Sequence, residues 1–383
     1  MISKRVARLV SAAAGATALL LAGLAGPASA ASTGNSASTR DAARYPTFSG
    51  RLYSVSASSA SNVWAAGLHP DAAMVVHWTG KTWAESPTLN LGYFNGVGTD
   101  SPTDVWAVGG TNWFSPSDTL IEHYNGTNWT HVPSPSPGEG GYLRAVTAIS
   151  PTDAWAVGLI GPGGDGVPGS TTPLIEHWNG TAWTRVRCPI PATGGQFYSV
   201  AASSPTDVWA VGWTGEDAAI DGQQNLIEHW NGTAWTRVPG PNPAGVENNL
   251  YGVDAISPTN AWAVGANTVT SNQSNAMILH WNGRSWKQVP SNSGASDALL
   301  NSVSGTSGHD AWAVGMLCRP QCATLALHWN GTAWSRVPTP NPAADYLNEL
   351  MGVVAICPHN VWAAGTTDYA NTLIAHWNGK SWS

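Results

Sequence analysis

A unit of about fifty residues recurs seven times in this chain of 383 residues, and no other sequence feature restricts the fold as strongly. In its third copy the unit contains Ser-Pro-Thr-Asp-Ala-Trp-Ala-Val-Gly from Ser150 to Gly158, then Leu-Ile-Glu-His-Trp-Asn-Gly-Thr-Ala-Trp from Leu174 to Trp183. A period of this length is typical of repeat architectures, in which one unit cannot bury its apolar face alone. The first tryptophan of each unit is Trp64, Trp106, Trp155, Trp209, Trp262, Trp312 and Trp362.

Each unit divides into four strand-length runs, which in the third copy are residues 142–149, 154–158, 174–178 and 181–186. Ser-Pro-Thr-Asp between the first two runs is typical of a tight turn. Asn-Gly between the last two is a strong hairpin signal, because both residues tolerate positive φ. We therefore predict four antiparallel strands per unit and an all-β fold, a seven-bladed β-propeller of four-stranded antiparallel blades.

Alternation along the second run predicts how the blades pack. Trp155 and Val157 point to one face of the strand, whereas Ala154, Ala156 and Gly158 point to the other. We expect each tryptophan to fill the hollow left by the small residues of the next blade. The first run repeats a valine in one register, as expected of a crowded inner strand, at Val55, Val97, Val146, Val200, Val253, Val303 and Val353.

The first thirty residues predict export. Lys4, Arg5 and Arg8 precede an Ala- and Leu-rich run from Leu9 to Leu24, and Ala28-Ser29-Ala30 fits a cleavage site. We predict a signal peptide over residues 1–30 and a secreted, extracellular protein; a membrane anchor is the alternative that the short apolar run disfavours. Residues 31–46 are expected to form a flexible leader, and residues 47–383 the propeller. The expected repeats are 47–90, 91–139, 140–193, 194–246, 247–297, 298–346 and 347–383.

The charge balance disfavours two classes of partner. The formal net charge is −7, and it becomes −10 when the three basic residues of the signal peptide are removed. Nucleic acid and anionic membrane surfaces are therefore not expected partners. No later segment is apolar enough for membrane insertion, and we expect a soluble monomer.

Four cysteines bear on the folding compartment. Cys318 and Cys322 flank three residues of one loop, and in an exported chain we expect them to form a disulfide. Two such ligands are too few for a zinc site, and no metal site is assigned. Cys188 and Cys357 fall in distant repeats and are expected to be unpaired.

The repeat resembles a known family. Val-Trp-Ala-Val-Gly followed by His-Trp-Asn-Gly-Thr-Ala-Trp-Thr-Arg-Val-Pro is similar to tectonin-type propeller repeats and to secreted bacterial propellers, some of which are lectins that bind sugars between blades. The resemblance extends from Arg51 to Ser383. Gly180 to Trp183 also matches half of the Asp-box of sialidase-like propellers, but Trp178 replaces the aspartate of that motif. The resemblance thus implies a lectin-like, carbohydrate-binding propeller rather than a sialidase.

Seven histidines share one register of the third run, and two interpretations are open. They could form metal or proton-relay sites, or they could pack and hydrogen-bond within each blade. We favour packing, because groups repeated around a ring cannot converge on one metal. Glu122, Glu176 and Glu228 precede three of them, with Arg185 and Arg237 on the adjacent strand, which predicts cross-strand ion pairs on an exposed face. The histidines are His77, His123, His177, His229, His280, His328 and His376.

Candidate ligand-binding residues lie where the repeats differ. The two tight turns are nearly constant, whereas the connections between runs two and three and between blades vary, and strand alternation places both variable sets on one face. The longest insertions are residues 159–173 and 213–225. Two off-template tryptophans suit stacking on a sugar or anchoring a partner, and the acids near the second could bind Ca²⁺. The candidates are Trp113, Trp213, Asp165, Glu216, Asp217 and Asp221.

No catalytic motif stands out. Gly-x-Ser-x-Gly, His-Glu-x-x-His, a phosphate loop and an EF-hand loop are absent from the sequence, so no catalytic residue and no cofactor is assigned. We expect a non-catalytic binding module that recognises glycan or a cell-surface partner through its variable loops. The alternatives are a polysaccharide-directed hydrolase or lyase, with Asp165 and Asp217 as acid and base, and a protein-interaction scaffold.

Overall fold

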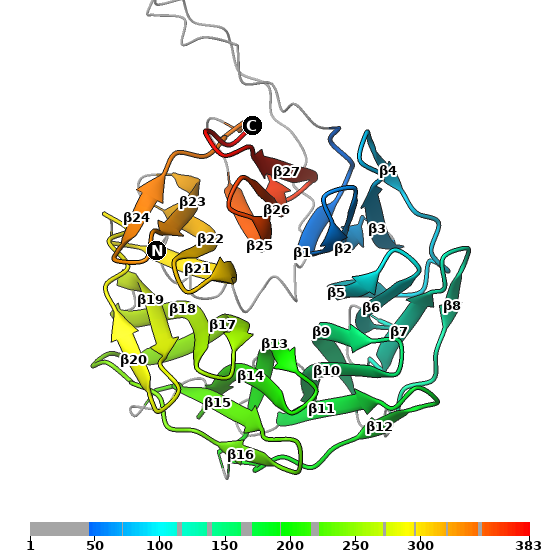
Figure 1. The fold of residues 1–383 in the computed structure, drawn as a ribbon, viewed down its shortest axis with the longest axis horizontal. Coiled ribbons are helices and arrows are strands. Elements are labelled where there is room, and N and C mark those ends of the chain that lie inside the picture. Colours follow the sequence, from blue (N-terminus) through cyan, green and yellow to red (C-terminus); the bar gives the residue numbers. More distant parts are fainter. Residues whose placement is uncertain are drawn as a thin grey trace, which may run out of the picture.

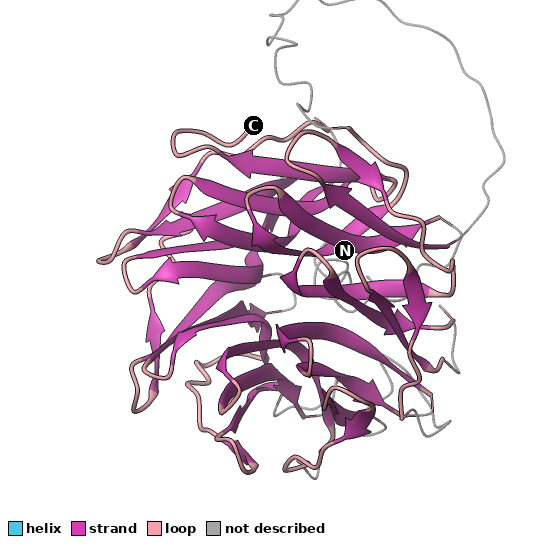
Figure 2. Ribbon diagram, turned by 45° about the vertical axis from the view of Figure 1, so that its right-hand side comes forward, coloured by secondary structure: helices cyan, strands magenta, loops and turns pink. Residues whose placement is uncertain are grey.

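Seven antiparallel sheets surround a common axis, each with its first strand nearest that axis (Figure 1). No helix occurs among the described residues, and the prediction of an all-β, seven-bladed β-propeller is confirmed (Figure 2). The computed structural model describes residues 46–70, 72–112, 117–135, 140–161, 171–191, 193–215, 222–270, 273–294, 296–318, 321–343 and 347–383.

In each of the first three blades the four strands follow one another in chain order, from the inner strand to the outer strand. Their strands are β1 (Arg51–Ser59), β2 (Asn62–His69), β3 (Ala72–Trp78), β4 (Trp83–Glu85), β5 (Tyr93–Ser101), β6 (Asp104–Gly110), β7 (Thr119–Tyr124), β8 (Trp129–His131), β9 (Gly141–Ser150), β10 (Asp153–Ile160), β11 (Thr172–Trp178) and β12 (Trp183–Arg185).

The remaining four blades repeat this order. Their strands are β13 (Gly195–Ser204), β14 (Asp207–Thr214), β15 (Gln224–Trp230), β16 (Trp235–Arg237), β17 (Glu247–Ser257), β18 (Asn260–Thr270), β19 (Gln273–Trp281), β20 (Trp286–Val289), β21 (Ala298–Ser307), β22 (Asp310–Cys318), β23 (Cys322–Trp329), β24 (Trp334–Val337), β25 (Asn348–Cys357), β26 (Asn360–Thr367) and β27 (Asn371–Trp377).

The outer strand of the seventh blade is the shortest. Beyond β27 the sheet continues only as a bridge from Trp382 to Trp377, with backbone hydrogen bonds in both directions between Ser383 and His376. Near the other end of β27, the Thr372 N–H donates to the Phe48 carbonyl at 2.9 Å. The segment before β1 therefore pairs with the last blade and closes the ring.

The inner strands are crowded around the axis and hydrogen-bonded between blades. The Ser302 hydroxyl of β21 accepts the Val353 N–H of β25 at 3.2 Å. On β17 the Asp254 carboxylate accepts the Gly305 N–H at 2.7 Å. A Cβ added to Gly252 of β17 would lie 2.8 Å from the Ser302 Cα of β21, so this close approach requires glycine.

Large aromatic residues pack against small residues across each blade interface. The prediction that the alanines of the next blade receive the tryptophan is confirmed. Trp106 of the second blade forms one buried cluster with Ala154 and Ala156 of the third. The predicted role of Gly158 is wrong: a Cβ there would lie 2.1 Å from the Tyr142 carbonyl of its own blade. The inner strand bulges toward this glycine, where the β9–β10 register shifts, so the glycine accommodates the bulge and not the next tryptophan.

The Asn-Gly turns form hairpins, as predicted, but with four-residue loops. Trp178 pairs with Trp183 across the turn, and the Asn179 side-chain oxygen accepts the N–H groups of Thr181 and Ala182 at 3.0 Å each. Only the glycine adopts positive φ, 87° at Gly180. The side-chain hydrogen bonds explain why asparagine precedes glycine at this turn.

Candidate functional site

Loops of two kinds lie on opposite faces of the disc. Because neighbouring strands are antiparallel in every blade, the constant turns share one end of the strands, and the variable connections share the other. We call the face with the second-to-third-strand connections and the interblade linkers the variable face, and the other the constant face. Their segregation, predicted from the repeat, is confirmed.

Most of the predicted ligand-binding residues lie outside the described residues. They are Trp113, Asp165, Glu216, Asp217 and Asp221. Their roles, including Ca²⁺ binding and acid–base chemistry, stay predictions. Within the described part of the chain, no group of three or more His, Cys, Asp or Glu side chains could hold a metal ion.

Trp213 does not stand on a loop. It belongs to β14, where it pairs with Gln196 of β13 and Asn225 of β15, and it is 9% exposed. The prediction that Trp213 lies on a variable loop is wrong, because β14 extends to Thr214 and the ring is buried. Its role in ligand binding stays a prediction. Trp213 offers little surface to a ligand.

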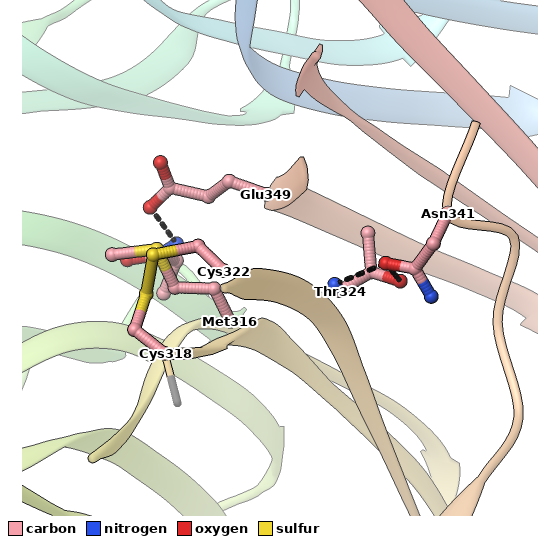
Figure 3. The surroundings of a disulfide bond; sticks show 7 residues. Met316, Cys318, Cys322, Thr324, Asn341 and Glu349 are labelled. Atoms are coloured by element: carbon pink, nitrogen blue, oxygen red, sulfur yellow. Dashed lines mark hydrogen bonds between the residues drawn. A yellow bond between two sulfur atoms is a disulfide. The ribbon is translucent and has the colours of Figure 1, made fainter. Parts of the chain in front are cut away.

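The four cysteines comprise one disulfide and two free thiols. Cys318 and Cys322 are cross-strand partners at the variable end of β22 and β23, and a disulfide joins them (Figure 3). The Met316 sulfur lies 3.8 Å from the Cys318 sulfur. Cys188 and Cys357 are free. The disulfide lies at the edge of the variable face, where it closes a short hairpin.

The seven histidines pack within their blades, which confirms the packing interpretation. The His177 ring lies 4.2 Å from the Trp155 ring, centroid to centroid, and its Nε2 donates to the Asp153 carboxylate at 2.9 Å. The same contact recurs in every blade, with asparagine in place of aspartate in three of them. The acceptors are Asn62, Asp104, Asp153, Asp207, Asn260, Asp310 and Asn360.

Three glutamates occupy blade interfaces instead of an exposed face. Glu122, Glu176 and Glu228 are each 0% exposed, so the predicted surface ion pairs are wrong. Each glutamate shares its register with aliphatic residues of other blades, and the linker of the preceding blade covers it. The Ser134 hydroxyl donates to the Glu176 carboxylate at 2.9 Å, and the Leu89 N–H donates to Glu122 at 3.2 Å.

Burial raises the pKa of these three carboxyl groups. Desolvation raises the pKa of Glu122 and Glu176 to about 7 and that of Glu228 to about 8, with Arg237 opposing the shift at Glu228. Neither oxygen of Glu228 has a hydrogen-bond partner among the described residues, and the Cys188 thiol stands where Ser134 stands one blade earlier. This burial could not be predicted from the sequence, because a glutamate beside a histidine is typical of a half-exposed strand.

Two positions of each inner strand differ in residue type from blade to blade. At two and four residues before the repeated valine, side chains differ from blade to blade, whereas the residue between them is always leucine or phenylalanine. We call the two varied positions the axial ring. Its members are Arg51, Tyr53, Tyr93, Asn95, Tyr142, Arg144, Gln196, Tyr198, Asn249, Tyr251, Leu299, Asn301, Glu349 and Met351.

The axial ring lies in the half of the inner strands that is nearest the variable face, since those strands begin there. Polar and aromatic residues dominate it, and most are partly exposed at the position two before the valine. The ligand-binding residues that the sequence predicts are all assigned to loops and include no member of this ring. Variation inside an otherwise constant strand was the signal that could have revealed it.

An arginine lies at the centre of the most connected sector. Arg144 donates from Nε to the Gln196 side-chain oxygen at 3.1 Å and from Nη2 to the Tyr142 hydroxyl at 2.9 Å. Its guanidinium carbon lies 4.2 Å from the centre of the Tyr198 ring, and that ring packs edge-on against Tyr251 at 5.1 Å. We call these five residues the arginine cluster.

On the opposite side of the axis the ring contains a glutamate. The Asn301 amide donates to the Glu349 carboxylate at 2.9 Å and to the Leu350 carbonyl at 2.9 Å. Burial raises the pKa of Glu349 to about 7, against the lowering effects of Asn301 and Arg51. Arg51 donates to the Tyr369 carbonyl at 2.8 Å.

Exposed hydrophobic side chains gather on the variable face. Leu89 and Leu91 lie in the linker from the first to the second blade, Ile190 in the third linker and Val246 in the fourth. Tyr369 lies in the turn between β26 and β27. These five are the large hydrophobics that are exposed among the described residues, at 39% to 55%, and none of them lies on the constant face.

A groove of about 700 Å³ lies between the last and the first blade, at the constant side of the rim. Trp78, Trp83 and Trp362 form its apolar wall, and Lys81 and His376 add polar groups. Trp83 and Trp362 are 5% and 2% exposed, so most of their surface serves the interface between the blades.

Comparisons with known proteins agree with this fold. The chain matches YCF48 bound to a D1 peptide (TM-score 0.54, 14% identity) over 87% of its own length and 95% of that chain. A PL25 ulvan lyase bound to -[GlcA(1-4)Rha3S]- matches with a TM-score of 0.54 and 9% identity, over 87% of this chain and 95% of that chain. A fucose-specific lectin from Aleuria aurantia matches with a TM-score of 0.45 and 12% identity, over 75% of this chain and 92% of that chain. No protein-family profile and no curated protein matches the chain.

The YCF48 and ulvan lyase matches agree with the propeller fold, and at 14% and 9% sequence identity they show the fold alone. They leave the resemblance to tectonin-type repeats and the export of the chain as predictions. The described residues contain no helix long and apolar enough to cross a membrane.

Proposed function

We propose that this protein is a secreted, non-catalytic binding module that recognises glycan or a cell-surface partner through its variable face. One observation carries the proposal: all five exposed large hydrophobic side chains of the described residues lie on that face. Their position on one face favours that face over the other as the interaction surface.

The constant face offers a contrast within the same molecule. Its turns are nearly identical in all blades and pack on one another; a Cβ on Gly180 would lie 2.9 Å from the Thr152 side chain. Such packing explains the constancy of these turns by structure alone. The variable face and the axial ring are therefore the candidate ligand-binding surfaces.

The test is a binding screen with the chain that begins at Ala31. Glycan arrays and cell-wall pull-downs should show saturable binding, and replacing Leu91 and Ile190 together with serine should weaken it. The matched control replaces exposed constant-turn residues, Lys81 and Thr181, with serine and should bind normally. Absence of saturable binding, or equal loss in both double variants, would refute the proposal.

Export is tested separately. The mature protein recovered from the culture medium should begin after Ala30. A cell-retained protein that begins at Met1 would contradict the proposed secretion and leave the binding face to be explained inside the cell.

A further inference from the structure

We propose that the arginine cluster is a binding site for the acidic group, carboxylate or sulfate ester, of a sugar. The inference rests on the proposed function, since it names the chemistry of a ligand on the variable side of the molecule. It moves the ligand site from the insertions of the third and fourth blades to the inner strands β9, β13 and β17.

Arg144 is held in one orientation from three directions. Among the described residues, the Tyr142 hydroxyl and the Gln196 side-chain oxygen accept its hydrogen bonds, and the Tyr142 and Tyr198 rings lie 5.0 and 4.2 Å from its guanidinium carbon. Gln196 also donates to the Tyr198 hydroxyl at 3.3 Å. A planar guanidinium fixed in this way loses little entropy when it forms paired hydrogen bonds to a carboxylate or sulfate.

The aromatic members of the cluster suit a sugar. The Tyr198 and Tyr251 rings pack against each other at nearly right angles, 85°, and the part of the two side chains that is exposed is the surface open to a ligand. A tyrosine ring offers an apolar face for sugar C–H groups together with a hydroxyl for hydrogen bonding. The arginine cluster contains no aliphatic residue, so a sugar fits it better than the apolar side chains of a peptide would.

Charges around the cluster favour a ligand with isolated acidic groups. Burial raises the pKa of Tyr251, and the charges of Glu247 and Arg144 shift it in opposite directions. Glu349 and Arg51 occupy the far side of the axial ring. The net charge, −7 for the whole sequence and −10 without residues 1–30, would repel a dense polyanion. A single acidic group within contact of Arg144 is less affected, because charges beyond about 8 Å are largely screened at physiological ionic strength.

The experiment uses the full chain from Ala31 and an array of galacturonate, glucuronate and sulfated oligosaccharides beside methyl-esterified or desulfated counterparts. We expect an acidic member to bind about tenfold or more tightly than its neutral counterpart. Arg144→Met should abolish that difference, and Arg144→Lys should retain part of it. The matched control is Arg185→Met, an exposed arginine at the rim of the same blade, which should bind like the wild type.

Circular dichroism and thermal melting confirm that each variant is folded before binding is compared. A preference for carboxylate or for sulfate ester identifies which acidic group the site takes. Equal binding of acidic and neutral counterparts, or unchanged binding by folded Arg144→Met, overturns the inference while the proposed function stands. Arg144-dependent binding of a hexaglutamate peptide without glycan binding overturns the sugar assignment. If nothing binds to the variable face, both proposals fall.

Discussion

At the scale of single residues, each blade interface depends on a tryptophan that contacts groups from two blades. Trp209 is 0% exposed, stacks on His229 of its own blade, and meets Trp281 and Trp286 of the next at 4.9 and 5.1 Å. The histidine is fixed by its hydrogen bond to Asp207 at 2.7 Å. The repeated Trp, His and Asp or Asn are therefore explained by packing, and no metal or proton relay is needed.

Glu228 should make the protein less stable as pH rises. The unfolded carboxyl group releases its proton above about pH 4.5, whereas the folded one keeps it up to about 8. Rising pH between these values therefore favours the unfolded chain. Glu228→Leu, which copies Leu279 of the fifth blade, should increase the free energy of unfolding at pH 8 by on the order of 1–3 kcal/mol and change it little at pH 4.

Urea unfolding between pH 4 and pH 9 measures this effect, and the difference between variant and wild type isolates Glu228 from other titrating groups. The control, Glu85→Leu, changes an exposed glutamate of the first blade and should leave the pH dependence unchanged. A Glu228→Leu difference that is constant across this range would contradict the buried, protonated glutamate.

At the scale of elements, the constant turns are stabilised by their own side chains. Asn179→Ala removes the acceptor of two backbone N–H groups and should lower the free energy of unfolding by about 1 kcal/mol. Thr181→Ala in the same turn removes an exposed side chain and should have almost no effect. Thermal or urea unfolding distinguishes the two variants, and equal stability would show that the turn tolerates loss of its asparagine.

Blade interfaces should be far more sensitive than turns. Trp209→Ala leaves a large cavity between the fourth and fifth blades and should cost about 3–5 kcal/mol. Trp213→Ala, on the same strand but 9% exposed and outside the repeated contact, should cost less. Denaturant unfolding compares the two, and the opposite order would mean that Trp213 carries the greater packing load.

At the scale of the whole molecule, the ring is closed by residues that precede the first strand. Phe48 packs against the cluster between the last and the first blade, and its N–H donates to the Thr372 hydroxyl at 2.9 Å. Gly50 donates to the Ala370 carbonyl at 2.7 Å. These contacts tie the first blade to the last along a seam that is not spanned by a covalent linker.

Phe48→Ala should loosen this seam before any other. The Thr372 amide, which donates to the Phe48 carbonyl, should exchange its hydrogen faster in the variant, whereas the Val353 amide between the sixth and seventh blades should keep its wild-type rate. Hydrogen–deuterium exchange by mass spectrometry or NMR measures both. Uniform acceleration at every seam would instead indicate that the ring opens as one cooperative unit.

The sequence by itself determined the number of blades, the four strands of each blade and the separation of constant from variable connections. These follow from local turn chemistry and strand alternation, which the repeat shows seven times over. It also predicted the packing of Trp106 on Ala154 and Ala156, because large and small residues alternate at fixed positions.

Tertiary structure alone decided how Phe48 closes the ring and that Glu228 and Trp213 are buried. It also brought Arg144 of β9 against Tyr198 of β13, 54 positions apart. Each of these depends on contacts between blades, and the side-chain pattern of one strand is the same whether the next blade or solvent lies against it.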